Sequence, residues 1–210
     1  LDELKKQLLA VGGLVEVAIH KATVAVFERK LDLAEEVLAG DREIDEREVA
    51  IEEEYLKVLA LQQPVATDLR FIVAALKVNN DLERMGDLAV NIAERAVMLA
   101  KLPPAPMPTG IRSMVTKVEE MVRDSLGALV AVDVDKARRV LIADDEVDEI
   151  HRRTFDEMQT LMRQHSDQVE RATAVITISR NLERIGDQAT NIAEDVIFMV
   201  EGEIVRHGGF

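Results

Sequence analysis

The sequence predicts an all-α protein built as two tandem antiparallel three-helix bundles that are related by an internal repeat. Residues 80–95 and 180–195 are identical at ten of sixteen positions, and repetition at a fixed offset indicates a duplicated structural unit. Apolar residues recur at helical spacing in both halves, whereas sustained two-residue alternation is not found. A proline-rich run separates the two halves, which have similar lengths.

The composition favours helices around an aliphatic core. Hydrophobic residues make up 48% of the 210 residues and aromatic residues only 3%, which suits one or two helical domains with a sizeable core. The net charge of −14, without any basic cluster, argues against binding to nucleic acid and disfavours direct binding to anionic lipid. The absence of cysteine excludes disulfides and thiolate metal sites.

We expect a cytoplasmic protein that meets a membrane only indirectly, through its partners. The sequence as given begins at Leu1 and shows no signal peptide. It also contains no uninterrupted apolar stretch of the roughly 18 residues that a membrane-spanning helix requires.

The first half, residues 1–101, is expected to form helices over residues 2–29, 33–61 and 66–100. Asp32 is the expected N-cap of the second helix. The turn between the second and third helices is expected at Gln62-Gln63-Pro64. The apolar stripe of the third helix consists of Ile72, Ala75, Leu76, Leu82, Met85, Ala89, Ile92 and Ala96.

A linker over residues 102–110 is expected to separate this half from the second bundle, residues 111–210. It contains Pro103, Pro104, Pro106 and Pro108, four of the five prolines in the chain. Such a run cannot continue a helix and makes a stiff connection. The second half is expected to form helices over residues 111–131, 136–163 and 168–200, with Asp135 as an N-cap.

Both copies of the repeat carry the acidic motif Glu-Arg-x-Gly-Asp. Residues four apart share one face of a helix, so Glu83 and Asp87 form one acidic pair and Glu183 and Asp187 form another. The glycine inside each motif, Gly86 or Gly186, costs about 1 kcal/mol relative to alanine in a helix. Its presence suggests that a neighbouring helix or an ion approaches closely.

The preceding helix of each half presents a second acidic pair. These pairs are Asp41 with Asp45, and Asp144 with Asp148 followed by His151. In a symmetric hairpin that turns at Pro64, Asp45 lies level with Glu83 and Asp41 lies level with Asp87. The same geometry places Asp148 level with Glu183 and Asp144 level with Asp187.

Four carboxylates at one height would repel one another, and a multivalent cation would remove that cost. Oxygen ligands suit magnesium, manganese, calcium or iron, while His151 would admit zinc or iron more readily. The alternative is a solvated acidic surface in which Arg84 and Arg184 pair with the aspartates three residues later, an arrangement that contributes little to stability. Two such motifs, each level with a second acidic pair, favour metal sites.

At these residues the chain resembles the PhoU family of phosphate-signalling proteins, and the resemblance spans nearly the whole chain. The residues that carry it are Leu82 to Asp87, Leu182 to Asp187, Gly12-Gly13, Gly40-Asp41 with Asp45, Gln63 to Arg70 and Arg206 to Gly209.

The resemblance implies two similar three-helix bundles with metal clusters, of iron, zinc, manganese or magnesium, on the bundle surface. It places the metal ligands at Asp41, Asp45, Glu83, Asp87, Asp144, Asp148, Glu183 and Asp187. Asn91 and Asn191 are further candidate ligands, and His151 stands where the first repeat has Glu48, so the two sites are expected to differ in content.

The resemblance also implies a regulator without catalytic activity. We expect it to repress phosphate uptake and the phosphate-starvation response by coupling the ATPase subunit of a phosphate ABC transporter to a sensor histidine kinase, and we expect a homodimer. The alternatives are a metal-dependent phosphoester hydrolase, an accessory subunit of another phosphate transporter, and a structural adaptor whose acidic stripes bind no metal.

Overall fold

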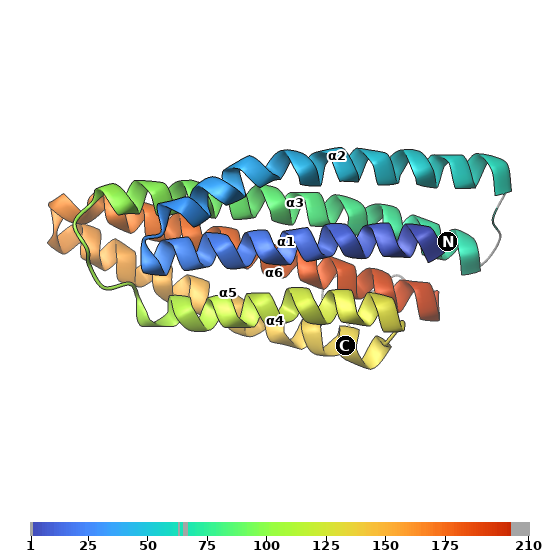
Figure 1. Cartoon of the computed structure of the whole chain (residues 1–210). Coiled ribbons are helices and arrows are strands. Elements are labelled where there is room, and N and C mark those ends of the chain that lie inside the picture. Colours follow the sequence, from blue (N-terminus) through green and yellow to red (C-terminus); the bar gives the residue numbers. More distant parts are fainter. Residues whose placement is uncertain (1, 63, 65–66, 203–210) are drawn as a thin grey trace.

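The computed structural model describes residues 2–62, 64 and 67–202, and all regular structure within these ranges is helical (Figure 1). The elements are α1 (Asp2–Glu28), α2 (Leu31–Gln62), α3 (Thr67–Lys101), α4 (Thr109–Ala131), α5 (Val134–Gln164), the short 3-10 helix η1 (Ser166–Gln168) and α6 (Val169–Glu201). The predicted all-α class is confirmed.

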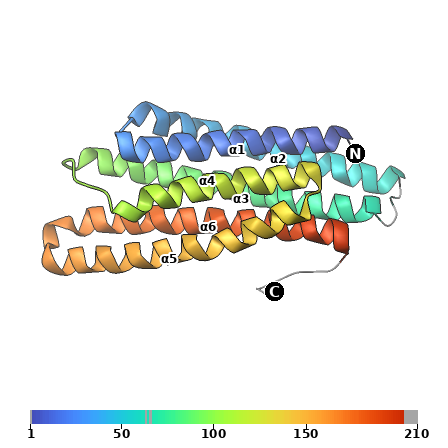
Figure 2. The ribbon, with the colours of Figure 1, turned by 90° about the horizontal axis from the view of Figure 1, so that it is seen from below.

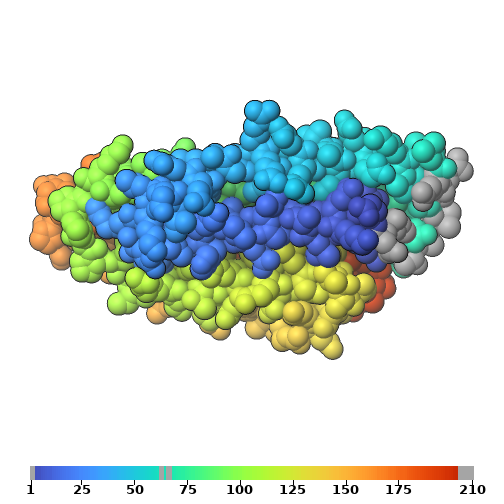
Figure 3. All heavy atoms as spheres, in the orientation of Figure 1, coloured from blue at the N-terminus to red at the C-terminus, as the bar shows by residue number. Residues whose placement is uncertain are grey.

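The two halves, α1–α3 and α4–α6, lie side by side along their length (Figures 1 and 2). α3 and α6 run antiparallel and make the most extensive contact between any two helices, so they form the centre of the molecule. α1 and α4 also touch, and α1 lies between α2 and α4 on the face seen in Figure 3. Each half therefore covers part of the apolar surface of the other.

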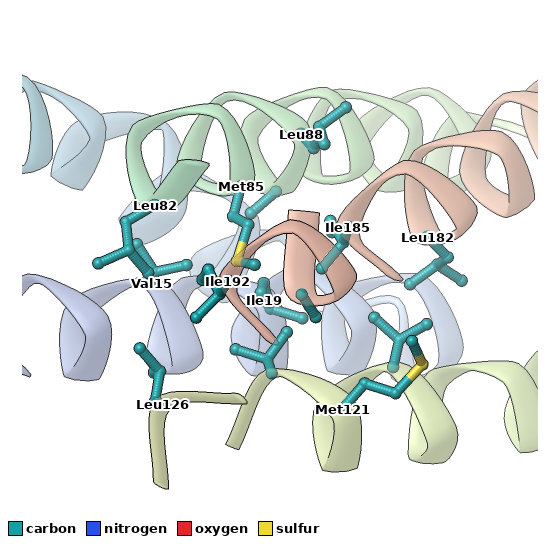
Figure 4. Packing of buried hydrophobic residues seen from close by; sticks show 14 of the residues in the cluster. Val15, Ile19, Leu82, Met85, Leu88, Met121, Leu126, Leu182, Ile185 and Ile192 are labelled. Atoms are coloured by element: carbon teal, nitrogen blue, oxygen red, sulfur yellow. The ribbon is translucent and has the colours of Figure 1, made fainter. Parts of the chain in front are cut away.

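The buried apolar residues form one continuous core across both halves. Figure 4 shows Met85 of α3 and Ile192 of α6 close to one another, with Ile19 of α1 nearby. Gly12 of α1 permits a close approach between the halves, because a Cβ atom at this position would lie 2.9 Å from Cδ1 of Leu126 on α4. Burial of this shared surface is the dominant favourable contribution to folding.

One described segment, Glu3–Glu28 in α1, is long and apolar enough to cross a membrane by length and composition alone. This differs from the expectation that no segment would have this character. A core helix has the same composition, and 44% of the most apolar window is buried inside the protein. The apolar face of this helix lies in the core of the bundle, where four of its side chains are at most 2% exposed: Leu4, Leu8, Val11 and Val15.

The helix bounds agree with the expected ones to within about two residues, but both predicted N-caps are wrong. α5 begins at Val134, and its N-cap is Asp133, whose Oδ1 accepts a hydrogen bond of 2.9 Å from the backbone N–H of Lys136. Asp135 therefore lies in the first turn. α2 begins at Leu31, which places Asp32 in its first turn as well. Of the expected turn residues, Gln62 ends α2, Pro64 is non-helical and Gln63 lies outside the described residues.

α1 and α4, the first helices of the two halves, are each followed by a non-glycine residue with a left-handed backbone. Arg29 has φ of 56° and Val132, at the equivalent position after α4, has φ of 54°. The side chain of Arg29 connects this turn to α3, because its guanidinium donates hydrogen bonds to the carbonyl oxygens of Ala100 (2.8 Å) and Leu102 (2.6 Å) beside the end of α3. Val132 is 46% exposed and β-branched, which makes this backbone conformation unfavourable.

We expect Val132→Gly to stabilise the protein by about 0.5–1 kcal/mol, because the relief of left-handed strain exceeds the extra entropy that glycine loses on folding. Urea unfolding followed by circular dichroism measures the change. Arg29→Gly is the matched control: it relieves the same strain but removes two hydrogen bonds, so it should give no gain. Equal stabilisation by both substitutions would contradict the explanation.

Candidate metal centres

The acidic residues of each half lie where two neighbouring helices approach closely. In the first half, a Cβ atom at Gly86 would lie 3.2 Å from Cδ1 of Ile44 and 4.0 Å from Oδ1 of Asp41. In the second half, a Cβ atom at Gly186 would lie 3.5 Å from Oδ1 of Asp144. The expected close approach of a neighbouring helix is therefore confirmed at Gly86, whereas a Cβ atom at Gly186 would make only ordinary van der Waals contact.

Buried apolar residues on the opposite faces of α3 and α6 determine which way the acidic residues point. Leu82 and Met85 are 0% exposed, as are Leu182 and Ile185 at the equivalent positions of α6. Because these apolar side chains fix the rotation of each helix, the glutamate and aspartate of each motif point toward α2 or α5. The acidic residues are partly buried or exposed rather than part of the core.

In the first half, the structure brings the two acidic pairs together as the hairpin geometry predicts. Burial raises the pKa of Asp41, and the negative charges of Asp45 and Asp87 raise it further. Burial also raises the pKa of Glu83, with contributions from Asp87, Glu48 and Asp45, partly offset by Arg84. Glu48, one turn beyond Asp45, therefore belongs to this cluster although it was not among the predicted ligands.

The pKa values of the carboxyl groups are raised further in the cluster of the second half. Burial raises the pKa of Asp144 to about 7, and Asp148, Asp187, Asp145 and Glu183 add to the rise. Burial likewise raises the pKa of Asp187 to about 6, assisted by Glu183 and Asp148. The pairs predicted to lie level, Asp144 with Asp187 and Asp148 with Glu183, thus repel one another across α5 and α6.

These residues fit a cation by the chemistry of their donor atoms. Oδ1 of Asp144 is buried without a hydrogen-bond partner, and a buried oxygen of this kind is costly unless something satisfies it. Within the described part of the chain, however, no three histidine, aspartate or glutamate side chains converge closely enough to hold a metal ion. A bound cation would therefore have to draw the carboxylates closer together than they lie here.

The three remaining predicted ligands lie in different surroundings. Nδ1 of His151 is 2.9 Å from Oγ of Ser179 on α6, and burial together with Arg180 lowers the pKa of the imidazole, against an opposing effect of Asp148. Asn91 is exposed on α3. Nδ2 of Asn191 lies 3.4 Å from Oδ1 of Asp81 on α3.

A further polar cluster lies between α3 and α6 and was not predicted. Nζ of Lys77 is 2.7 Å from Oδ1 of Asp195, and burial raises the pKa of Asp81 to about 7 with the help of Asp195. The repeat gives no signal for this cluster, because the second copy has Thr177 and Asn181 where the first has Lys77 and Asp81.

The raised pKa of Asp144 predicts a pH dependence of stability in the metal-free protein. The folded state holds the proton up to about pH 7, whereas an unfolded aspartate releases it near pH 4. The folded state therefore binds more protons in this window, and stability falls as the pH rises through it.

We expect Asp144→Asn to raise the melting temperature at pH 8 and to change it little at pH 4.5, measured with chelator present. Asp156→Asn, an exposed site on α5, is the control with the same charge change. Equal effects of Asp144→Asn on the melting temperature at both pH values would show that ionisation of Asp144 does not destabilise the folded protein.

Three comparisons with known proteins bear on this arrangement. The family model described as the PhoU domain matches twice, at residues 8–96 and 111–196. Among curated proteins, the "Phosphate-specific transport system accessory protein PhoU homolog" of Aquifex aeolicus is 43% identical over 207 residues, which cover 99% of this chain and 94% of that protein. The homologue from Pseudomonas putida is 40% identical, over 100% of this chain and 82% of that protein.

Two crystal structures have the same fold. That of PhoU from Pseudomonas aeruginosa superposes with a TM-score of 0.94 at 37% identity, covering 96% of this chain and 97% of that one. That of the phosphate transport system regulatory protein PhoU from Streptococcus pneumoniae gives a TM-score of 0.90 at 29% identity, covering 98% and 97% of the two chains.

Proposed function

Since the chain belongs to the PhoU family, we propose that it regulates phosphate uptake by protein contact and that metal ions bound to its two acidic clusters shape the contact surface. Its role is that of an accessory protein of phosphate transport, as its relatives are named. It is not an enzyme, because those relatives and structural neighbours are accessory and regulatory proteins. A phosphoester hydrolase is therefore set aside.

The observation that carries the metal proposal is the duplicated cluster itself. Asp41, Asp45, Glu83 and Asp87, with Glu48 beside them, form the first, and Asp144, Asp148, Glu183 and Asp187 form the second. A multivalent cation would neutralise the repulsion within each cluster and satisfy the buried oxygen of Asp144. It would also tie α2 to α3 and α5 to α6, since each cluster takes ligands from two helices.

We propose that the partners are the ATPase subunit of a phosphate ABC transporter and a sensor histidine kinase, and that the protein acts as a homodimer in the cytoplasm. Association with the phosphate transport system is supported by the relatives' names. The high negative charge favours contact with basic partner surfaces and would leave membrane attachment to those partners.

Complementation in a bacterial strain that lacks its own PhoU tests the proposal. Phosphate uptake and a phosphate-starvation reporter are measured in high phosphate. The full chain is expected to restore repression, and a variant with Asp41, Asp87, Asp144 and Asp187 all changed to asparagine is expected to restore much less at equal abundance. Asp156→Asn is the control.

Two outcomes would contradict parts of the proposal. Failure of the folded, expressed wild-type chain to repress would reject the regulatory role. Full repression by the quadruple variant would reject a role for metal in it. Binding of the purified chain to the ATPase subunit and to the kinase, measured by calorimetry, then identifies which partner it contacts.

A further inference from the structure

We propose that the interface between the two halves is selective: it fits a first half to a second half and rejects a pair of like halves. This inference goes beyond the proposed regulatory function and does not depend on metal. It rests on two separate contacts, a charge contact between α3 and α6 and a size contact between α1 and α4. Because the halves are copies of one unit, such selectivity requires interface residues that differ between the copies.

The charge contact lies where α3 packs against α6. Nζ of Lys77 lies 2.7 Å from Oδ1 of Asp195. One turn further along each helix, Nδ2 of Asn191 lies 3.4 Å from Oδ1 of Asp81, so both pairs follow the same antiparallel register. Asp195 is only 6% exposed, and a buried carboxylate is costly when its positive partner is removed.

The repeat places different residues at the equivalent contact. At the offset of 100 residues, Thr177 corresponds to Lys77, and Arg95 corresponds to Asp195. The same register therefore sets Thr177 opposite Arg95. Two first halves would instead set Lys77 opposite Arg95 twice, and facing like charges disfavour the wrong pairing. Two second halves would set Thr177 opposite Asp195 and deprive the buried carboxylate of its lysine.

The size contact lies between α1 and α4. Gly12 faces Leu126, which is labelled in Figure 4, and a Cβ atom at Gly12 would lie 2.9 Å from Cδ1 of Leu126. At the offset of 103 residues that relates α1 to α4, the equivalent residues are Val115 and Thr23. Thr23 faces α4, since its Oγ1 lies 3.5 Å from Oε1 of Glu119, one turn beyond Val115. The interface thus sets glycine opposite leucine on one side and valine opposite threonine on the other.

Two like halves would mismatch at the size contact. Two second halves would set Val115 against Leu126, and a valine needs more room than the single Cβ atom that is already too close at Gly12. Two first halves would set Gly12 against Thr23, which leaves space unfilled. Only a first half with a second half avoids both the overlap and the cavity.

The charged residues between α1 and α4 do not add to this selectivity. Nδ1 of His20 lies 3.1 Å from Oε1 of Glu119, and their counterparts Arg123 and Glu16 line the same groove. Every combination of halves would set a basic side chain opposite a glutamate here. Selectivity therefore comes from the α3–α6 charges and the α1–α4 sizes, and the proposed homodimer must form through another surface.

Exchange of single residues between the copies tests the size contact within the full chain. Gly12→Val places the residue of the second copy opposite Leu126 and is expected to lower the melting temperature by about 2–4 °C. Leu126→Thr destabilises wild type but is expected to stabilise Gly12→Val, because together they reproduce the valine–threonine contact. Val73→Thr, an exchange at a residue of α3 that is 38% exposed, is the control and should change little. Thermal unfolding is followed by circular dichroism with chelator present.

The charge contact is tested by Thr177→Lys, which sets the new lysine opposite Arg95 as two first halves would. We expect a lower melting temperature, and we expect Arg95→Asp to restore it, because the exchanged pair reproduces the lysine–aspartate contact. Arg95→Asp alone is the reference, since it also breaks the ion pair with Glu94 (3.3 Å). Thr173→Lys, exposed and one turn earlier on α6, is the control that Arg95→Asp should not rescue.

Each part of the inference can be overturned separately. If Leu126→Thr destabilises Gly12→Val as much as it destabilises wild type, the size contact is not selective. If Arg95→Asp fails to rescue Thr177→Lys, or rescues Thr173→Lys equally, the charge contact is not selective. A single variant that does not fold leaves the measurement decisive, because the exchanged pair is still expected to fold. Since chelator removes any metal, either result leaves the proposed function standing.

Discussion

Replacing Leu182 with alanine is expected to lower the free energy of unfolding by about 2–5 kcal/mol, the usual cost of such a cavity in a packed core. Leu182 is 0% exposed and directly precedes Glu183, so the substitution tests whether the residues beside the acidic motif hold α6 against the core. Urea unfolding followed by circular dichroism measures the change.

Ile142→Ala on α5 is the control for Leu182, since Ile142 is 72% exposed and its truncation should change stability by less than about 0.5 kcal/mol. A small effect at Leu182, comparable to that at Ile142, would mean that α6 is not rotated as described. The acidic face of α6 would then be misplaced as well.

Metal binding is expected to stabilise the folded chain by about 2.7 kcal/mol when the free metal concentration is one hundred times its dissociation constant. The reason is that the folded state gathers the carboxylates of two helices whereas the unfolded chain does not. Thermal and urea unfolding with and without Mn²⁺ or Zn²⁺, after chelation, measure the effect.

Paired substitutions divide this stabilisation between the halves. Asp41→Asn with Asp87→Asn should remove the contribution of the first cluster, and Asp144→Asn with Asp187→Asn that of the second. Asp156→Asn should change nothing. Equal metal-induced stabilisation in wild type and in the variant that combines all four substitutions would contradict the ligand assignment.

Much of the local structure could be predicted because it depends on neighbours in sequence. The hydrophobic period located all six α-helices, although not the short 3-10 helix η1, and hairpin symmetry about Pro64 correctly placed Asp41 near Asp87. The N-caps were less predictable: Asp133 and Asp135 are both good capping residues, and only the position of the first helical turn distinguishes them.

Contacts between the halves could not be predicted from the repeat. Side-by-side packing of α3 against α6 brings Asn191 to Asp81 and Lys77 to Asp195, over more than one hundred residues of sequence. The periodicity of one helix fixes which face is buried but not which other helix covers it. For the same reason, the serine beside His151 was not recognised, since Ser179 follows from the register of α5 on α6.

The metal content of the purified chain, measured by elemental analysis before and after chelation, tests the central claim most directly. We expect iron, manganese or zinc bound in both halves, reduced by the paired substitutions in either half and lost in the variant that combines all four. A chain that takes up no metal when these ions are supplied, or that retains its full metal content in the combined variant, would contradict the claim that the duplicated acidic clusters are metal centres.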